Sequence, residues 1–351
     1  MARKILVSAG EASGDLYASL VVEELRRLLP GADFFGCTGP RLRAAGVRTV
    51  AAEKPDLAIL TDSPDFHLRV ARRLSRQGVP VVYLVAPQAW AWRKGRLKRM
   101  RHTVRRLLCI FPFEEDFFNR EGVSATYIGH PLAGLVKPTL DRDEFFRKHE
   151  LDPSRPLIAV LPGSRRGESA RHLPALLDAA GRLAREHAAN LVLPASATTG
   201  AGFFRERLGN SPIRVIEGES WDAMAHAQVA LAASGTVTVE AALLGTPMVT
   251  FYRVTPLSWM AGKFLVNVPF YSMVNLIAGR AVVPELMQGQ MTGERIAREA
   301  SRLLTQESAR MEMRAGLAEV KARLTQGGMP APCRAAAIVQ EILEGQAAHV
   351  S

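Results

Sequence analysis

Hydrophobic and polar residues follow two alternating patterns along the chain, and together these predict a parallel α/β fold. Short apolar runs predict buried strands, and between several of them apolar residues recur every three to four positions, as in amphipathic helices. In the first part of the chain the predicted strands are Lys4–Ser8, Asp33–Cys37, Leu57–Leu60, Val81–Val85, Leu107–Phe111 and Thr126–Ile128, and the clearest helices are Leu16–Leu29 and Phe66–Arg76. Strands that alternate with helices in this way form a parallel sheet covered by helices.

The pattern stops after Pro138 and resumes beyond a charged, proline-containing connection. The later predicted strands are Leu157–Leu161, Leu191–Pro194, Ile213–Ile216, Val229–Ala232 and Met248–Tyr252. We therefore predict two domains, 1–150 and 151–330, each a doubly wound, Rossmann-like sheet. The C-terminal helix within 331–351 is a candidate to pack back on the first domain, by analogy with other chains of this architecture.

One connection is short for this fold. Residues Val47–Val50 look like a strand, yet six residues separate them from Leu57. A parallel crossover normally takes about ten residues or more. Two explanations stay open: Val47–Val50 is an edge piece of the sheet, or a crossover helix is absent.

The two predicted domains begin alike. KILVSAGEASGD and LIAVLPGSRRGE each read as a strand, a glycine-containing loop and a helix. Open α/β sheets bind ligands at the carboxyl ends of their strands, so we expect the two domains to face each other across an interdomain cleft. Neither loop has the G-x-G-x-x-G or Walker A spacing, which argues against a nicotinamide enzyme and a P-loop NTPase.

The most informative segment is Ala233–Pro247, ASGTVTVEAALLGTP, where a strand passes directly into an apolar helix. Ser234, Gly235 and Thr236 leave the first N–H groups of that helix uncovered, and the helix dipole adds a positive end, so this turn predicts an anion site. Glu240 lies one turn further on, within reach of ribose hydroxyls. We expect Gly235 to allow a sharp turn here. The alternative is an ordinary capped helix with an exposed glutamate.

A second candidate anion site lies in LPGSR. Gly163 and Ser164 offer N–H and hydroxyl donors, and Arg165 offers a bidentate guanidinium suited to phosphate. Because the motif follows a predicted strand, phosphate binding is favoured over a structural ion pair for Arg165.

TDSPDFH follows another buried strand and places Asp62 at the same edge of its sheet. A carboxylate there can take a proton from an attacking hydroxyl. Turn formation explains Asp62 equally well, and Asp65 is expected to cap the helix that begins at Phe66.

Four weaker candidates, Glu11, Ser13, His130 and Asn275, accompany these motifs on the acceptor side. Ser13 or Asp15 is expected to cap the first helix while Glu11 faces the cleft, and His130 and Asn275 are candidate substrate contacts with structural alternatives. The sequence has no D-x-D pair, no H-E-x-x-H and no clustered His/Cys, so we expect neither a metal site nor a cofactor.

Composition adds a question about partners. The chain has 351 residues, 48% of them hydrophobic, and a net charge of +11; its three cysteines are too far apart for a zinc motif. No apolar run reaches the length of a membrane span and no signal peptide is evident, so a cytoplasmic chain is expected. Eight Lys/Arg residues crowd Arg93–Arg106, next to Trp90 and Trp92. This run fits a solvated helix face, an anionic membrane surface or nucleic acid.

Taken in order, the motifs resemble the lipid-A-disaccharide synthase family. The matching segments are SAGEASGD, the GP of CTGPRL, DSPDF, PQAWAWR, FPFE, YIGHP, LPGSR, ASGTVTVEAALLGTPMV, YR, NLIAGR and VPELMQ, and they run from Ser8 to Gln288. The resemblance implies an inverting, metal-independent glycosyltransferase of the two-domain GT-B type. It would transfer 2,3-diacylglucosamine from UDP to the 6-hydroxyl of 2,3-diacylglucosamine 1-phosphate (lipid X).

The resemblance also assigns roles and a location. Asp62 would be the general base or an essential acceptor contact, while Arg165 and Glu240 would hold UDP with Ser234, Gly235 and Thr236 at its phosphates. The enzyme would work on the anionic inner face of the inner membrane, without nucleic acid; its oligomeric state stays open. Family members usually carry a longer segment between Val50 and Pro55, with apolar residues implicated in membrane docking, and its shortening puts docking and acyl-chain capture in question.

Two other hypotheses remain at this stage. An enzyme like UDP-N-acetylglucosamine 2-epimerase would share the two-domain plan, but it would not need PQAWAWR followed by a basic run. A non-catalytic, membrane-associated lipid or nucleotide binder would have no need to retain Asp62, Arg165 and Glu240 together.

Overall fold

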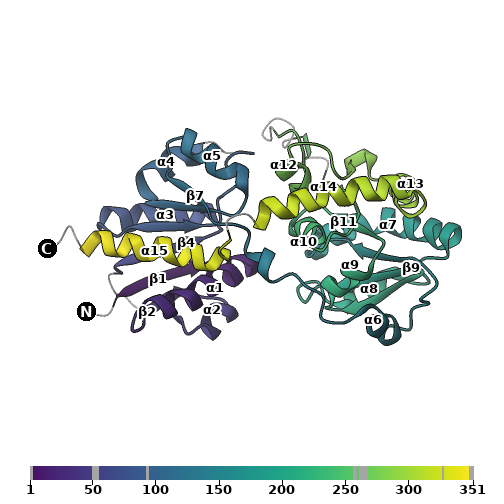
Figure 1. Cartoon of the computed structure of the whole chain (residues 1–351), viewed down its shortest axis with the longest axis horizontal. Coiled ribbons are helices and arrows are strands. Elements are labelled where there is room, and N and C mark those ends of the chain that lie inside the picture. The colour runs from purple at the N-terminus through teal and green to yellow at the C-terminus, as the bar shows by residue number, and fades with distance from the viewer. Residues whose placement is uncertain are drawn as a thin grey trace. The chain divides into compact units, whose positions relative to one another are not determined.

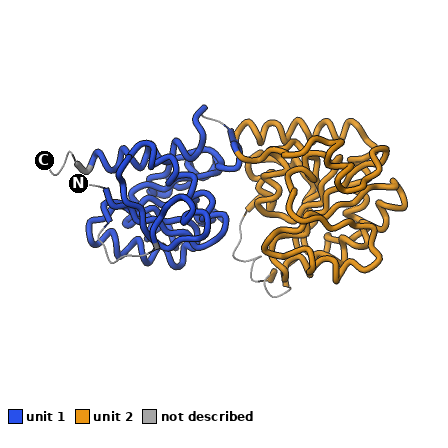
Figure 2. The backbone as a smooth tube through the Cα atoms, turned by 90° about the horizontal axis from the view of Figure 1, so that it is seen from below, with its two compact units in different colours: residues 1–134, 324–351 blue, residues 135–323 orange. Residues whose placement is uncertain are grey.

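The computed structural model describes residues 3–49, 55–91, 95–255, 259–260, 268–325 and 328–347. The chain forms two compact units (Figure 2): unit 1 contains residues 1–134 and 324–351, and unit 2 contains residues 135–323. Each unit is an α/β fold with its own sheet (Figure 1).

In unit 1 the described residues form a seven-stranded sheet in the order β3-β2-β1-β4-β5-β6-β7, with every neighbouring pair parallel. The strands are β1 (Lys4–Ala9), β2 (Asp33–Cys37), β3 (Arg48–Thr49), β4 (Leu57–Thr61), β5 (Val81–Leu84), β6 (Arg106–Cys109) and β7 (Ala125–Tyr127). All residues of β4 and β5 are buried, as expected for central strands covered on both faces.

The helices of unit 1 are α1 (Ala12–Leu28), α2 (Pro40–Ala44), α3 (Pro64–Arg76), α4 (Gly95–Thr103), α5 (Pro112–Arg120) and α15 (Ala331–Ala347), with a 3₁₀ turn at Pro131–Gly134. Apolar residues of α3, α4 and α5 share one buried cluster with β4, β5 and β6. The C-terminal helix α15 belongs to unit 1, where it packs against α1.

The short connection predicted after Val47–Val50 leads out of an edge strand. β3 pairs with β2 alone among the described strands and ends the sheet at that side. Residues 50–54 lie outside the described part of the chain, and β4 then begins at Leu57 beside β1.

In unit 2 the described residues form a six-stranded parallel sheet in the order β10-β9-β8-β11-β12-β13. The strands are β8 (Leu157–Leu161), β9 (Asn190–Ala195), β10 (Ile213–Glu217), β11 (Val229–Ala233), β12 (Met248–Tyr252) and β13 (Glu285–Met287). The helices are α6 (Arg142–Lys148), α7 (Arg166–His187), α8 (Ala201–Leu208), α9 (Ser220–His226), α10 (Thr236–Leu244), α12 (Met273–Ala278), α13 (Gly293–Thr305) and α14 (Glu307–Thr325), with a 3₁₀ turn at Gln288–Gln290. The predicted strands are all present, and β13 was not predicted.

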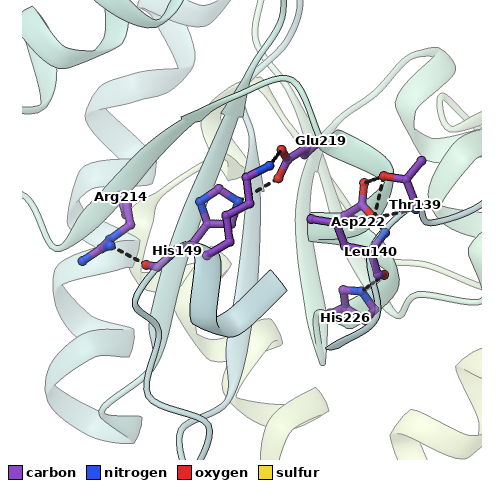
Figure 3. A network of polar contacts seen from close by, with 8 residues as sticks. Thr139, Leu140, His149, Arg214, Glu219, Asp222 and His226 are labelled. Atoms are coloured by element: carbon purple, nitrogen blue, oxygen red, sulfur yellow. Dashed lines mark hydrogen bonds and ion pairs between the residues drawn. The ribbon is translucent and has the colours of Figure 1, made fainter. Parts of the chain in front are cut away.

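Unit 2 begins earlier than residue 151, because the connecting segment is hydrogen-bonded to α9. The Asp222 carboxylate accepts the backbone N–H groups of Thr139 and Leu140, at 2.6 and 2.7 Å, and also the Thr139 hydroxyl (Figure 3). On the same helix His226 Nε2 lies 2.9 Å from the Leu140 carbonyl oxygen, to which it donates.

A second group of contacts holds the end of this segment. Glu219 forms an ion pair with Lys148 and a hydrogen bond with His149 Nε2, and Arg214 on β10 donates to the His149 carbonyl (Figure 3). Residues 135–150 therefore belong to the second unit and not, as predicted, to the first. Their charged, proline-rich composition suggested a linker, but these partners come from residues some 65 to 86 positions away, which local composition does not reveal.

Candidate functional site

Each sheet has one place where the direction of its winding reverses. In unit 2 this lies between β8 and β11, because β9 and β10 continue on one side and β12 and β13 on the other. In unit 1 it lies between β1 and β4. Ligands of open α/β sheets bind beyond the carboxyl ends of the strands at such points. The predicted motifs LPGSR and ASGT follow β8 and β11, and GEASGD and TDSP follow β1 and β4.

In unit 2 the turn after β11 leaves the start of α10 open. Gly235 is the N-cap of α10, so no side chain caps the first N–H groups. Gly235 and Thr236 are exposed, and Ser234 donates its hydroxyl to the Tyr271 carbonyl at 3.0 Å. An uncapped helix start with its positive dipole end facing solvent is suited to an anion.

The reason for glycine at 235 differs from the predicted one. Its φ of 168° is extended backbone that any residue adopts, so a sharp turn does not require it. A Cβ atom at Gly235 would have no heavy atom within 4 Å among the described residues. Nothing that the structure describes in this chain therefore demands glycine, which is consistent with a ligand approaching the backbone at this point.

The LPGSR turn lies next to it, since Leu161 of β8 is paired with Ala232 of β11. Arg165 is the N-cap of α7, and its side chain makes no capping hydrogen bond. Ser164 and Arg165 are both exposed. The helices α7 and α10 therefore both begin without a side-chain cap, after neighbouring strands. The guanidinium group of Arg165 belongs to the first of these two turns.

Gly163 in this turn is required by the protein itself. Its φ is 117°, in the region that favours glycine, and a Cβ there would lie 2.8 Å from Cδ of Glu168. The Ser169 hydroxyl donates to the Gly163 carbonyl at 3.0 Å and the Thr199 hydroxyl to the Ser164 carbonyl at 2.8 Å. The backbone of this turn is therefore held from two sides before any ligand binds.

Glu240 is partly buried, one turn inside α10. Burial raises its pKa, while a hydrogen bond from Trp221 opposes that change. Trp221 lies on α9, which packs against α10. The sequence indicated Glu240 but gave no signal for Trp221, because the two residues meet only through helix packing.

A buried histidine ties together two strand ends of unit 2. On α7, His172 Nδ1 donates to the Pro162 carbonyl at 2.8 Å, and Nε2 accepts the backbone N–H of Arg253 at 3.0 Å. This pattern requires a neutral ring, and burial lowers the His172 pKa in agreement. Arg253, which follows β12, donates its own guanidinium to the carbonyls of Gln288 and Met291. Sequence reasoning missed His172.

In unit 1 the corresponding place is filled by the chain itself. Asp62, directly after β4, accepts the N–H of Gly10 on Oδ1 at 2.9 Å and that of Glu11 on Oδ2 at 3.0 Å. These N–H groups belong to the turn between β1 and α1. Desolvation by burial raises the Asp62 pKa, and the two N–H bonds counteract part of this rise.

Three expectations for helix caps in unit 1 are wrong. Glu11 is the N-cap of α1, without a side-chain cap, whereas exposed Ser13 and buried Asp15 lie inside the helix. The Asp15 carboxylate accepts backbone N–H groups at the start of α2, including that of Arg41 at 2.9 Å. Asp65 lies in the first turn of α3 and pairs with Arg96 at 2.9 Å, so it does not cap that helix. Each carboxylate found a partner distant in sequence.

The other two acceptor-side candidates are buried. His130 is 3% exposed, its Nδ1 accepts the N–H of Leu132 at 3.2 Å, and desolvation lowers its pKa to about 3, so the ring is neutral. Asn275 is 1% exposed. Its amide donates to Val283 and Glu285 and accepts from Val282 and Val283, and these bonds tie α12 to the start of β13.

The residues of the basic run, Arg93–Arg106, differ in their exposure to solvent. Arg96 is buried, whereas Lys98, Arg99, Arg101 and Arg105 are exposed. Trp92, Arg93 and Lys94 lie outside the described residues.

Trp90 before this run is half-buried, and its indole donates to Glu114 at 3.1 Å. The apolar stretch Trp259–Tyr271 is a further candidate for membrane contact, with burial in the core as the alternative. Residues 261–267 are outside the described part, and Met260 and Tyr271 are exposed at either side. No described helix is long and apolar enough to span a membrane, and no group of three or more potential metal ligands occurs among the described residues.

Comparison with known proteins identifies relatives over almost the whole chain. The family model for lipid-A-disaccharide synthetase matches residues 5–54 and 47–339, in two parts that overlap where the connection after β3 is short. The lipid-A-disaccharide synthase of Solibacter usitatus is 70% identical over 380 residues, covering 99% of this chain and all of the relative. That of Myxococcus xanthus is 41% identical over 97% of each chain.

Solved structures share the fold at low identity. The calicheamicin glycosyltransferase CalG4 has a TM-score of 0.60 at 16% identity and 98% coverage of both chains. A UDP-GlcNAc 2-epimerase from Neisseria meningitidis, bound to UDP-GlcNAc, has a TM-score of 0.62 at 12% identity, covering 97% of this chain and all of that one. The epimerase likeness is therefore one of architecture, whereas the sequence relatives are synthases.

Proposed function

The chain belongs to the lipid-A-disaccharide synthase family, glycosyltransferases of lipid A biosynthesis with the GT-B fold, and from this premise we propose which residues carry the reaction and what each does. The enzyme transfers 2,3-diacylglucosamine from UDP to the 6-hydroxyl of 2,3-diacylglucosamine 1-phosphate (lipid X). The products are the β-1,6-linked disaccharide 1-phosphate, formed with inversion, and UDP.

The observation that carries the donor site is the pair of uncapped helix starts at the carboxyl ends of β8 and β11. The N–H groups of Gly235 and Thr236 bind the diphosphate beside Ser234, together with Gly163 and Ser164 of the neighbouring turn. The Ser234 N–H itself donates to the Phe251 carbonyl at 2.8 Å. Arg165 supplies a full positive charge to the same group. Glu240 accepts hydrogen bonds from the ribose hydroxyls.

The leaving group needs this charge. Breaking the glycosidic bond to UDP puts negative charge on the diphosphate, and donors fixed by the protein stabilise it without rearranging during the reaction. We propose that Arg165 and the starts of α7 and α10 fill this role in place of a metal ion.

On the acceptor side we propose Asp62 as the general base. Its raised pKa makes it a stronger base than an ordinary aspartate, while the N–H bonds from Gly10 and Glu11 stabilise its charged form. The exposed side chains of Glu11 and Ser13 are on the same turn and are suited to contact the acceptor sugar. His130 and Asn275 act by shaping the fold, since both are buried and hydrogen-bonded.

Both substrates carry acyl chains, so we propose that the enzyme works at the anionic inner face of the inner membrane. The exposed basic residues Lys98, Arg99, Arg101 and Arg105 suit phosphate headgroups there. The shortened segment between Val50 and Pro55 reduces the apolar part of this attachment.

The test is an assay with UDP-2,3-diacylglucosamine and lipid X in detergent mixed micelles, without added metal and with a chelator present. We expect stoichiometric UDP and disaccharide 1-phosphate. Absence of the disaccharide would overturn the proposed reaction, and a strict requirement for a divalent cation would overturn the role given to Arg165.

A further inference from the structure

Asp62 is held in an unusual backbone conformation. Its φ is 52° and that of the next residue, Ser63, is 39°, both in the left-handed region that residues other than glycine rarely occupy. Such a conformation persists only where surrounding contacts fix it. The position of the Asp62 carboxylate, on which the proposed function depends, therefore requires other residues to hold this backbone conformation.

Two side chains provide that support by binding the same atom. The Tyr83 hydroxyl and His67 Nδ1 both donate to the backbone carbonyl of Asp62, the latter at 3.0 Å. Since a carbonyl can only accept, Nδ1 carries a proton, and Nε2 is hydrogen-bonded to the Ser8 hydroxyl at 2.8 Å. Tyr83, His67 and Ser8 are all buried, on β5, α3 and β1 respectively.

Gly10 in the facing turn and Gly14 at the start of α1 complete the arrangement. A Cβ on Gly14 would lie 1.8 Å from Asp62 Oδ2, and a Cβ on Gly10 would lie 2.1 Å from Ser63 Oγ. The carboxylate can therefore reach the N–H groups of Gly10 and Glu11 only because both positions lack side chains. The facing turn thus holds the Asp62 carboxylate through its N–H groups, and Tyr83 and His67 hold the Asp62 backbone carbonyl.

We propose that Tyr83 and His67 are positioning residues for catalysis, which fix the left-handed backbone at Asp62 and so place its carboxylate for proton transfer. This inference rests on the proposed function, in which Asp62 is the base. Neither residue contacts the reacting atoms. Both act through the Asp62 carbonyl, so their loss moves the carboxylate while the donor site in unit 2 keeps its own residues.

The first test compares Tyr83→Phe, His67→Leu and His67→Asn in the full-length enzyme. Misplacing a catalytic group by about 1 Å costs on the order of 100-fold in rate. We expect kcat to fall about 10- to 100-fold for Tyr83→Phe and His67→Leu, with the KM for the UDP-sugar within about twofold. The His67→Asn variant should recover part of the loss, because its amide can still donate to the Asp62 carbonyl.

A matched control is His187, whose Nε2 lies 2.7 Å from the Ser301 hydroxyl. It is the last residue of α7, at the opposite end of that helix from the LPGSR turn. We expect His187→Leu to leave kcat within about twofold. Amide exchange gives an independent reading: exchange at Gly10 and Glu11 should accelerate in Tyr83→Phe, as their acceptor moves away.

A double-mutant cycle with Asp62→Asn separates positioning from a general loss of structure. If Tyr83 acts through Asp62, adding Tyr83→Phe to Asp62→Asn lowers kcat no further. A full additional loss in the double variant, or wild-type kcat in Tyr83→Phe beside an inactive Asp62→Asn, would overturn this inference alone. Wild-type kcat in Asp62→Asn would instead overturn the role of Asp62, and this inference with it.

Discussion

The turn after β1 in unit 1 and the turn after β8 in unit 2 occupy the same place in two sheets wound in the same order. In unit 1 the residue that follows the neighbouring strand β4 is Asp62, whose carboxylate accepts the N–H groups of Gly10 and Glu11 in the facing turn. In unit 2 the residue that follows the neighbouring strand β11 is Ser234, whose hydroxyl donates to a carbonyl elsewhere. Unit 1 thus supplies the Asp62 carboxylate as an acceptor at this place, whereas unit 2 has Ser234, and not a carboxylate, after β11 to meet the N–H groups at the start of α10.

The difference shows how one architecture serves two purposes. Backbone N–H groups at a strand-to-helix turn need an acceptor, and a carboxylate or a phosphate can provide it. A buried histidine supports each arrangement: His67 bridges the ends of β1 and β4, and His172 bridges the ends of β8 and β12. The frame is similar, and the residue after the strand decides between an internal carboxylate and an external ligand.

The largest expected effect comes from removing the internal anion. In Asp62→Ala we expect kcat to fall by about 1,000-fold or more, as for loss of a general base, while the Kd for UDP stays within about twofold. Steady-state kinetics and calorimetry measure the two quantities. If UDP binding weakened as much as turnover, the two turns would not be separate in function.

The next effect sharpens the role of unit 2. Replacing Arg165 by alanine removes a charge-assisted bond to the diphosphate, so we expect UDP to bind about 10- to 100-fold more weakly. Arg185, in the last turn of the same helix α7, is the matched control and should leave the Kd unchanged. Equal effects of the two substitutions would point to general electrostatic attraction and not to a site.

A smaller effect concerns the pH dependence of stability, which we expect the buried Glu114 carboxyl group of unit 1 to influence. Glu114 is 1% exposed, and burial raises its pKa to about 8 in spite of hydrogen bonds from Trp90, Phe111 and Ile110. Because the folded state holds this proton more tightly than the unfolded chain, the free energy of unfolding should fall as pH rises from about 4.5 to about 8.

Glu114→Gln should remove this part of the pH dependence, as measured by urea unfolding at pH 5 and pH 8. The control is Asp116→Asn, at an exposed position of the same helix α5, which should keep the wild-type slope. An unchanged slope in Glu114→Gln would mean that Glu114 is already ionised in the folded protein at pH 5.

Much of this picture follows from local patterns, and the rest depends on packing. Apolar runs located the strands of both sheets, and the motifs after β8 and β11 located the open turns, because strand ends and glycine turns are local features. The short strand β13 was missed, since Glu285–Met287 has three residues and a charged start. The domain boundary was misplaced because side chains of α9 and β10 bind residues 139–149 from far along the chain.

The site residues divide in the same way. That Asp62 lies beside Gly10 and Gly14 could not be predicted, because only the β1–β4 pairing brings the two turns together. His67, His172 and Trp221 stand on helices where nothing in the local sequence marks their partners. At Gly235 the expected sharp turn is wrong: its backbone is extended, and a Cβ there would meet open space among the described residues.

The most direct measurement gives unit 2 the carboxylate that unit 1 has. Ser234→Asp places an anion after β11, where Asp62 stands after β4, and Ser234→Asn serves as the neutral control of the same size. Calorimetric titration with UDP should show binding at least 100-fold weaker for Ser234→Asp than for Ser234→Asn. The reason is that the introduced carboxylate either occupies the diphosphate site or repels the diphosphate. Equal UDP affinity in the two variants would contradict the placement of the diphosphate at the β8–β11 turns.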